Sequence, residues 1–151
     1  MSSTDATIHL RAGGVLLDLV RYPYALLEPP VAGPGGMPVA GLLDLATMKL
    51  AAIARRGLRR DFWELYAIHD AGVSLSDAMT AYHERFGTAE ADAYHVLRSL
   101  TYFDDAEAEA VFPAGLTEAR WRRMKDFFVE EAPRQLAESK GARRGRKPPR
   151  R

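Results

Sequence analysis

The chain has 151 residues, of which 47% are hydrophobic and 27% charged, and its formal net charge is +1, as in an ordinary globular protein. The length predicts a single domain, and the absence of cysteine excludes disulfides and thiolate zinc sites, which fits a reducing cytoplasm. No apolar run is long enough to span a bilayer and the N-terminus lacks signal-peptide features, so we expect a cytoplasmic protein with no membrane partner.

The first predicted element is a β-hairpin. Thr7–Arg11 alternates apolar and polar residues, a Gly-Gly pair offers a turn, and Val15–Tyr22 forms the second strand. Asp18 interrupts the apolar run of that strand, and the residues alone favour an edge-strand aspartate in water, which protects against aggregation. The segment Glu28–Pro38, rich in proline and glycine, predicts a loop.

The next stretch predicts two helices joined by an arginine-rich turn. Asp44–Ala54 is rich in strong helix formers, and Gly57 follows it as an expected left-handed cap. A second helix is expected to start near Asp61. Its apolar stripe repeats at i, i+3, i+4 and i+7: Phe62, Leu65, Tyr66 and His69.

The charged side chains of this stretch form a candidate site. Lys49 projects beside the core face of its helix, and Asp61 and Glu64 are i, i+3 neighbours on the next one. Four arginines surround the turn: Arg55, Arg56, Arg59 and Arg60. Such a set could hold the phosphates of a nucleotide and a metal ion. The alternative, which the spacing alone favours, is a helical hairpin joined by surface ion pairs.

Three further segments predict helices. A Ser-x-x-Asp cap opens Ser74–Gly87, another helix covers Asp92–Tyr102, and Thr117 caps a last helix that we expect to end near Pro133. The acidic stretch Asp104–Glu109 allows metal binding, but a solvated acidic turn is the stronger interpretation.

The C-terminus is a basic tail. Lys140–Arg151 holds seven positive residues and no acidic one, which leaves 14 positive against 20 negative side chains in residues 1–139. We expect residues 1–139 to form the domain and the tail to be disordered. Its basic residues would bind RNA phosphates in a salt-dependent way, unless the tail only aids solubility. The candidates are Arg143, Arg144, Arg146 and Lys147.

Three collinear segments carry a family resemblance. Asp44–Tyr66 contains the pattern D-L-x-x-M-K-L-x-A-I-x-x-R-G-x-x-R-D-F-x-[DE]-L-Y, and Leu19–Pro30 and His95–Glu107 match two further signatures. Together they resemble the AbiEii/AbiGii abortive-infection family of nucleotidyltransferase toxins, over roughly Thr7 to Phe128. The resemblance implies a toxin of a phage-defence or type IV toxin–antitoxin system. Its reaction would be nucleotide transfer from an NTP to RNA, often a tRNA 3′ end.

One departure from the family pattern limits this expectation. Family members carry a Gly-Ser motif followed by an Asp-x-Asp pair that holds Mg²⁺, and this chain has neither; its nearest approach is Glu90-Ala-Asp92. The chain thus resembles the C-terminal portion of a member. We therefore expect it to be catalytically incomplete, with Mg²⁺ bound only if the missing lobe is supplied. The alternative is a non-catalytic helical module that binds RNA or protein.

The resemblance also implies a fold and partners. The expected fold class is α+β: a short β-hairpin, the remnant of a nucleotidyltransferase sheet, packed on a mainly helical bundle of about five helices. Because a two-stranded hairpin is marginal alone, the open sheet edge favours self-association or a partner chain. NTP, RNA and a cognate antitoxin are the other partners expected.

Carried over residue by residue, the resemblance assigns roles to the candidate site. Lys49 would contact the triphosphate, and Asp61 would orient or deprotonate the acceptor with Glu64 in support. Asp18 would be the surviving sheet carboxylate, with a catalytic and metal-binding role. Two arginines would bind phosphate: Arg56 and Arg60.

Overall fold

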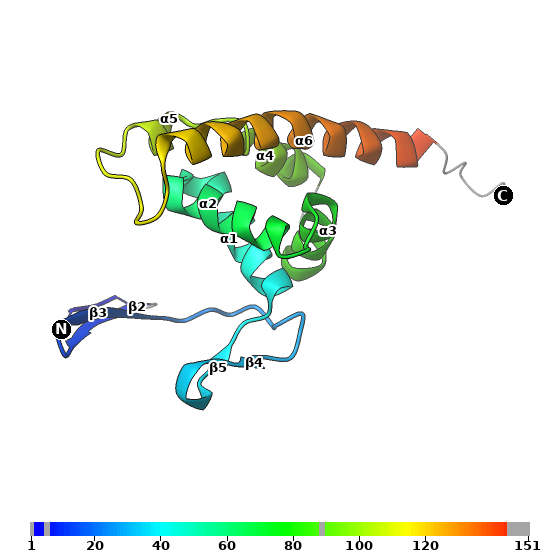
Figure 1. The fold of residues 1–151 in the computed structure, drawn as a ribbon. Helices are drawn as coiled ribbons and strands as arrows, with labels where there is room; N and C mark the ends of the chain where they lie inside the picture. Colours follow the sequence, from blue (N-terminus) through cyan, green and yellow to red (C-terminus); the bar gives the residue numbers. More distant parts are fainter. Residues whose placement is uncertain (1, 5–6, 88–89, 145–151) are drawn as a thin grey trace, which may run out of the picture.

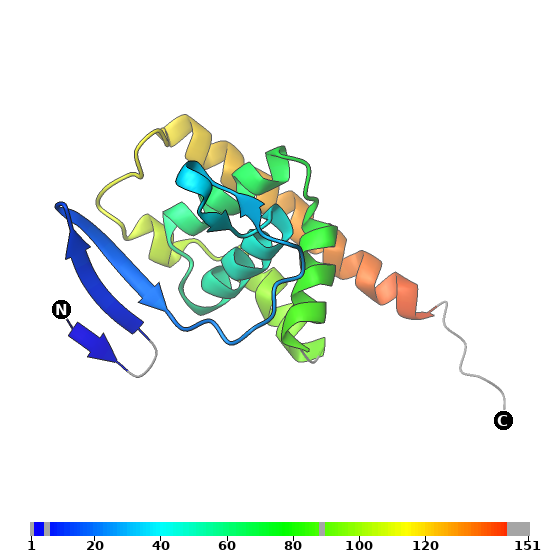
Figure 2. The ribbon, with the colours of Figure 1, turned by 90° about the horizontal axis from the view of Figure 1, so that it is seen from below.

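The structure, a computed structural model, describes residues 2–4, 7–87 and 90–144. Its α+β fold confirms the prediction of a short hairpin and about five helices. The described residues form five longer helices and one additional one-turn helix, α5. The helices form a bundle with α6 along one side, and the hairpin lies on the opposite side (Figures 1 and 2). The helices are α1 (Leu42–Arg56), α2 (Arg59–Asp70), α3 (Leu75–Phe86), α4 (Glu90–Ser99), α5 (Asp104–Glu107) and α6 (Glu118–Arg144).

Two small antiparallel sheets precede the helices. The first has the order β1-β2-β3, so the predicted hairpin gains a third short strand. The second lies within the predicted Pro/Gly loop, where a short 3-10 turn (η1, Pro34–Gly36) connects its two strands. The strands are β1 (Ser2–Thr4), β2 (Thr7–Ala12), β3 (Val15–Val20), β4 (Val31–Ala32) and β5 (Pro38–Val39).

The β2–β3 hairpin has one wholly apolar face. Side chains directly opposite in an antiparallel pair share a face, and three such pairs are apolar: Ile8 with Leu19, Leu10 with Leu17, and Ala12 with Val15. The other face is mixed, because it carries His9 and Asp18. The expected packing of this hairpin on the helices is not observed. It projects away from them (Figure 2), and on its apolar face Ile8 is 37% and Leu17 42% exposed.

This open face gives a first testable expectation. The apolar face and the unpaired edge of β3 are the features that favour association with a second copy of the chain. Leu17→Lys should therefore weaken concentration-dependent dimerisation measured by analytical ultracentrifugation. Leu16→Lys is the matched control, because Leu16 lies on the mixed face of the same strand and is 71% exposed. Equal behaviour of the two variants would argue against association through the apolar face.

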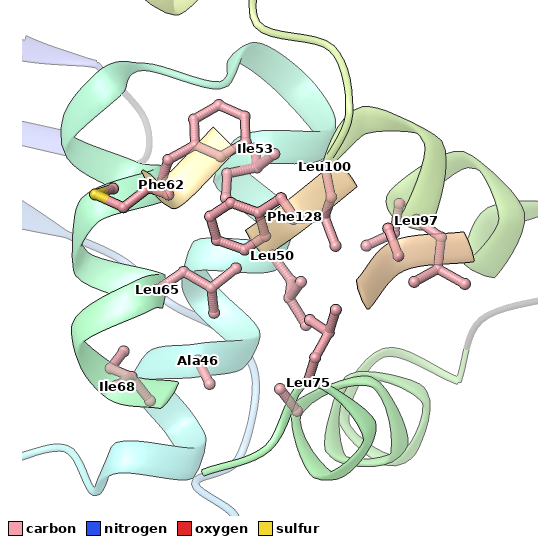
Figure 3. Packing of buried hydrophobic residues seen from close by; sticks show 14 of the residues in the cluster. Ala46, Leu50, Ile53, Phe62, Leu65, Ile68, Leu75, Leu97, Leu100 and Phe128 are labelled. Atoms are coloured by element: carbon pink, nitrogen blue, oxygen red, sulfur yellow. The ribbon is translucent and has the colours of Figure 1, made fainter. Parts of the chain in front are cut away.

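The hydrophobic core lies among the helices. Phe62 is fully buried near its centre, with its ring centroid 5.5 Å from Phe128, 5.2 Å from Phe103 and 5.8 Å from Trp121. Figure 3 shows residues of α1, α2, α3, α4 and α6 converging there. Aromatic rings at these separations contribute beyond their buried area.

The prediction for Gly57 is wrong in its conformation. Its φ of −73° is ordinary extended backbone, not the left-handed cap that we expected. Glycine is needed for space, because a Cβ at this position would lie 2.8 Å from the Phe62 ring. The close approach of Phe62 therefore accounts for the glycine after α1.

A buried ion pair attaches the segment after the hairpin to the helices. Asp44, fully buried in the first turn of α1, accepts hydrogen bonds from the backbone N–H groups of Leu27 at 3.0 Å and Glu28 at 3.1 Å. Its Oδ1 lies 2.8 Å from Nη1 of Arg85 in α3. The same Nη1 donates to the hydroxyl of Thr47 at 2.9 Å. These contacts join three distant segments of the chain.

Helix α6 extends past the predicted end at Pro133 to Arg144, so that prediction is wrong. Proline removes one helical hydrogen bond, but Phe128 and Ala132 are buried on the same helix, and this packing holds the chain helical around an exposed proline. Past residue 139 the helix runs into the predicted tail, of which residues 145–151 lie outside the described part. Among the described helices, none has the length and apolarity needed to cross a membrane.

Candidate functional site

The turn between α1 and α2 brings together the lysine and both carboxylates of the predicted site. Lys49 Nζ, on α1, lies 3.1 Å from Asp61 Oδ1, on α2. It also forms an ion pair with Glu64 Oε2, one turn further along α2. The ammonium group thus lies between two carboxylates, and the side chain of Lys49 is still 23% exposed.

Local structure explains why Asp61 occupies this position. It is the third residue of α2, and its Oδ2 accepts a hydrogen bond from the Leu58 N–H at 3.4 Å. A carboxylate in the first turn of a helix satisfies a free N–H group and interacts favourably with the helix dipole. Asp61 is therefore fixed by its own helix as well as by Lys49, and it is buried.

The ion pairs keep Lys49 positively charged. Burial alone would lower the pKa of Lys49, but the hydrogen bonds to Glu64 and Asp61 outweigh it and raise the pKa above its usual value. A lysine with a raised pKa does not release its proton near neutral pH, so it is unsuited to act as a general base. It suits a fixed positive charge that binds an anion.

The arginines of the turn divide into two groups. Arg55, Arg56 and Arg60 are exposed, and Arg60 Nε lies 3.7 Å from Glu64 Oε1 at the edge of the site. Arg59 instead is buried, and its guanidinium donates to the carbonyl of Glu109 at 3.1 Å and stacks 4.0 Å from the ring centre of Phe112. Arg59 is thus a packing residue, whereas Arg56 and Arg60 remain accessible to phosphate.

Asp18 lies apart from the other predicted site residues. It is on β3, its side chain is 63% exposed, and its Oδ1 lies 2.7 Å from Nδ1 of His9. The hairpin that contains β3 projects away from the helices, so β3 lies apart from the α1–α2 turn (Figure 1). Among the described residues, the polar partner recorded for this carboxylate is therefore His9.

The residues described do not fit a magnesium site by themselves. Mg²⁺ requires a near-octahedral set of oxygen ligands, and Asp18 is a lone carboxylate, while Asp61 and Glu64 already bind Lys49. In residues 2–4, 7–87 and 90–144 no group of three or more His, Asp, Glu or Cys side chains is arranged to hold a metal. A metal role for Asp18 stays a prediction that requires ligands from elsewhere.

The acidic stretch after α4 takes part in packing. Glu107 accepts a hydrogen bond from Lys125 Nζ at 2.6 Å and another from the indole N–H of Trp121 at 3.0 Å. The hydrogen bond from Lys125 is the main cause that lowers the pKa of Glu107. Glu109 accepts the backbone N–H of Arg59 at 2.6 Å. These carboxylates anchor α5 and its loop to α2 and α6.

The predicted RNA-binding residues of the tail are described only in part. Arg143 and Arg144 belong to the last turn of α6, where the structure gives the path of the backbone. Arg146 and Lys147 lie outside the described residues. Phosphate binding by these four residues stays a prediction.

A pocket that the sequence did not predict lies between α2 and α6. Its lining includes Trp63, Tyr66 and Asp70 of α2 and Arg120 and Arg123 of α6. The first three residues repeat at i, i+3 and i+7 on the outer side of α2, which is a recognisable stripe. The arginines are far away in sequence, so only the tertiary structure unites the two halves.

Comparison with known proteins gives two positive findings. The family model "Nucleotidyl transferase AbiEii toxin, Type IV TA system" matches residues 6–143. The chain is also 31% identical over 128 residues to an uncharacterized protein of Aquifex aeolicus, across 83% of this chain and 59% of the relative. The match thus spans about three fifths of the length of that curated relative. No solved structure matches the chain.

Proposed function

This chain belongs to the nucleotidyl transferase AbiEii toxin family of type IV toxin–antitoxin systems, and we propose that it provides the phosphate-binding half of a site that transfers a nucleotide from an NTP to RNA. The observation that carries this proposal is the position of Lys49 between Asp61 and Glu64. A cognate antitoxin is the partner that membership of such a family suggests.

Lys49 is proposed to bind the triphosphate. Its ammonium has three N–H donors and keeps its charge, so a phosphate oxygen can bind while the carboxylates hold the side chain in place. This arrangement is preorganised, which reduces the cost of reorienting charges when the negative charge of the phosphates moves during transfer. Arg56 and Arg60 are exposed on the same turn and would supply further cations.

Asp61 is proposed to act on the RNA acceptor. In the transfer, a hydroxyl oxygen of RNA, for instance at a tRNA 3′ end, forms a bond to the α-phosphorus, and the bond to pyrophosphate breaks. The hydroxyl proton must pass to a base, and Asp61, with support from Glu64, is a fixed carboxylate beside the proposed triphosphate position.

Complete catalysis is proposed to require carboxylates that this sequence does not offer. The chain contains no Gly-Ser motif followed by Asp-x-Asp, and its described residues do not form a magnesium site. Magnesium, when bound by a supplied lobe, would neutralise phosphate charge and polarise the reacting phosphorus. We therefore propose low activity for this chain alone, with Asp18 completing a metal site only beside such a lobe.

The experiment that tests this proposal is incorporation of a labelled NTP into RNA in the presence of Mg²⁺. Asp61→Ala should abolish the incorporation that the wild-type chain supports, because the acceptor loses its carboxylate. Asp77→Ala is the control, since Asp77 lies in the first turn of α3, where its backbone N–H binds Ser74. Incorporation that neither Lys49→Ala nor Asp61→Ala reduces would defeat the assignment.

A second candidate function is a non-catalytic helical module that binds RNA or a protein partner. It is favoured by the absence of a metal-binding cluster among the described side chains. In this case RNA affinity should persist without Mg²⁺ or NTP, because phosphate contacts to basic residues need neither. Deleting Lys140–Arg151 should then remove most of the affinity in a filter-binding assay, and retention of full affinity would count against the module.

A further inference from the structure

A pocket of about 320 Å³ lies between α2 and α6. This volume is at the lower end of the range for small-molecule sites. Its wall on α2 contains the rings of Trp63 and Tyr66, and α6 contributes Arg120 and Arg123. Two aromatic rings beside two guanidinium groups are the combination that binds a base together with its phosphate.

Neighbouring residues hold both rings of the pocket in place. A Cβ at Gly115 would lie 3.3 Å from the indole of Trp63, so the loop before α6 backs this ring closely. Gly115 also has a φ of +85°, which favours glycine at this position. The ring of Tyr66 packs edge-on against Phe127, with 5.2 Å between the centroids. The aromatic wall is therefore positioned before any ligand binds.

The arginines of the pocket are available to an anion. Arg123 is exposed, and its guanidinium has no hydrogen bond or ion pair within the described part of the chain. The guanidinium of Arg120 makes one long hydrogen bond, 3.4 Å, to the Gly115 carbonyl. By contrast, Arg122 and Arg134 on the same helix are within 4.0 Å and 2.6 Å of glutamates. Among the described side chains, the two arginines of the pocket thus have no carboxylate within 4.0 Å, although Asp70 also lines the pocket.

One rim of the pocket lies one helical turn from two charged residues of the α1–α2 turn. Arg60 and Trp63 are i, i+3 neighbours on α2, and so are Glu64 and Ala67, which lines the pocket. Residues with this spacing lie about 5–6 Å apart at their Cβ atoms. Arg60 and Glu64 are therefore near the rim of the pocket, whereas Asp61, nine residues before Asp70, lies on the opposite side of α2.

We propose that this pocket binds one nucleotide of single-stranded RNA, with its base stacked on Trp63 and Tyr66 and a backbone phosphate bound by Arg120 and Arg123. This inference rests on the proposed function, in which RNA is the acceptor. It adds a place on α2 and α6 where the acceptor strand is held. Stacking of this kind tolerates any base, so the pocket fixes the position of the strand rather than its sequence.

Tryptophan fluorescence tests the proposal in the full-length chain. The protein has two tryptophans, and Trp121 is fully buried, so quenching by a bound base reports on Trp63. A single-stranded oligoadenylate, added without NTP or Mg²⁺, should quench the fluorescence, and Trp63→Phe should remove this signal. Trp63→Leu should weaken binding at least about fivefold.

Two arginine variants separate the pocket from general charge. Arg123→Ala should weaken oligonucleotide binding about five- to tenfold and reduce the slope against log salt by about 0.7, the value for one phosphate contact on a single strand. Arg122→Ala removes the same charge one residue away, outside the pocket, and should change affinity less than about twofold. Because Arg123 has no described partner to lose, its replacement should leave thermal unfolding unchanged.

Three results would overturn the proposal. They are equal weakening by Arg122→Ala and Arg123→Ala, oligonucleotide binding without quenching of Trp63, and quenching by ATP but not by oligoadenylate. The second result would indicate that the pocket binds a protein segment, and the third that it binds a free nucleotide. Quenching by oligoadenylate in a wild-type chain whose Lys49 does not bind ATP would refute the proposed triphosphate site and still support the pocket.

Discussion

Replacing Asp44 with alanine is expected to lower the free energy of unfolding by about 3–5 kcal/mol, the cost of removing one partner of a buried ion pair. Asp44 is 0% exposed and the side chain of Arg85 is 1% exposed, so the remaining guanidinium would keep a buried, uncompensated charge. Two nitrogens of this guanidinium, Nε and Nη2, already have no hydrogen-bond partner among the residues that the structure describes. The backbone N–H groups of Leu27 and Glu28 would also lose their acceptor.

Urea denaturation measures this loss, and a surface ion pair provides the control. Arg122→Ala removes a partner of Glu118 at 4.0 Å on the exposed side of α6 and should cost less than about 1 kcal/mol. Asp44→Asn should fall between the two, because an amide oxygen still accepts hydrogen bonds but carries no charge. A similar small effect for Asp44→Ala and Arg122→Ala would contradict the role given to the buried pair.

Replacing Lys49 with alanine is expected to weaken binding of ATP about 10- to 100-fold. A hydrogen bond to a charged group contributes about 1.5–3 kcal/mol, and the loss of Lys49 also leaves Asp61 and Glu64 as two uncompensated carboxylates facing the phosphates. The variant thus replaces an attraction with a repulsion. Isothermal titration calorimetry at fixed ionic strength measures the affinity.

The control for Lys49 is Lys125 of α6. Lys125 is also partly buried in an ion pair, 2.6 Å from Glu107, and its side chain lies on α6 rather than on the α1–α2 turn. Lys125→Ala should leave ATP affinity within about twofold, and circular dichroism should show both variants folded. Equal losses in the two variants would indicate nonspecific attraction of ATP to positive charge.

Local sequence signals predicted much of the fold and part of the site. Ser74 caps α3 by accepting the N–H of Asp77, and the helix ends at Gly87, as predicted. Lys49, Asp61 and Glu64 also converge, because a short turn joins their helices and the spacing within α2 fixes the two carboxylates. Such features depend on residues close in sequence, so patterns along the chain reveal them.

Features that depend on tertiary contacts could not be predicted. Asp44 and Arg85 are 41 positions apart, and nothing in either local pattern indicates that they meet. The place of Gly57 at the end of a helix indicated a left-handed cap, yet the close approach of the Phe62 ring is the reason for the glycine. The pocket forms only where α2 and α6 lie side by side. The sequence alone therefore could not show that Arg123 lies beside the aromatic stripe of α2.

The most direct test of the central claim is the chemical reactivity of Lys49 with and without ATP. Acetylation of the folded protein by an amine-reactive ester, followed by mass spectrometry, reports on Lys49 and Lys125 in one sample. If Lys49 contacts the triphosphate, saturating ATP should slow its acetylation at least about tenfold and leave the rate at Lys125 unchanged. Acetylation of Lys49 at the same rate with and without ATP would contradict the assignment of this lysine to phosphate binding.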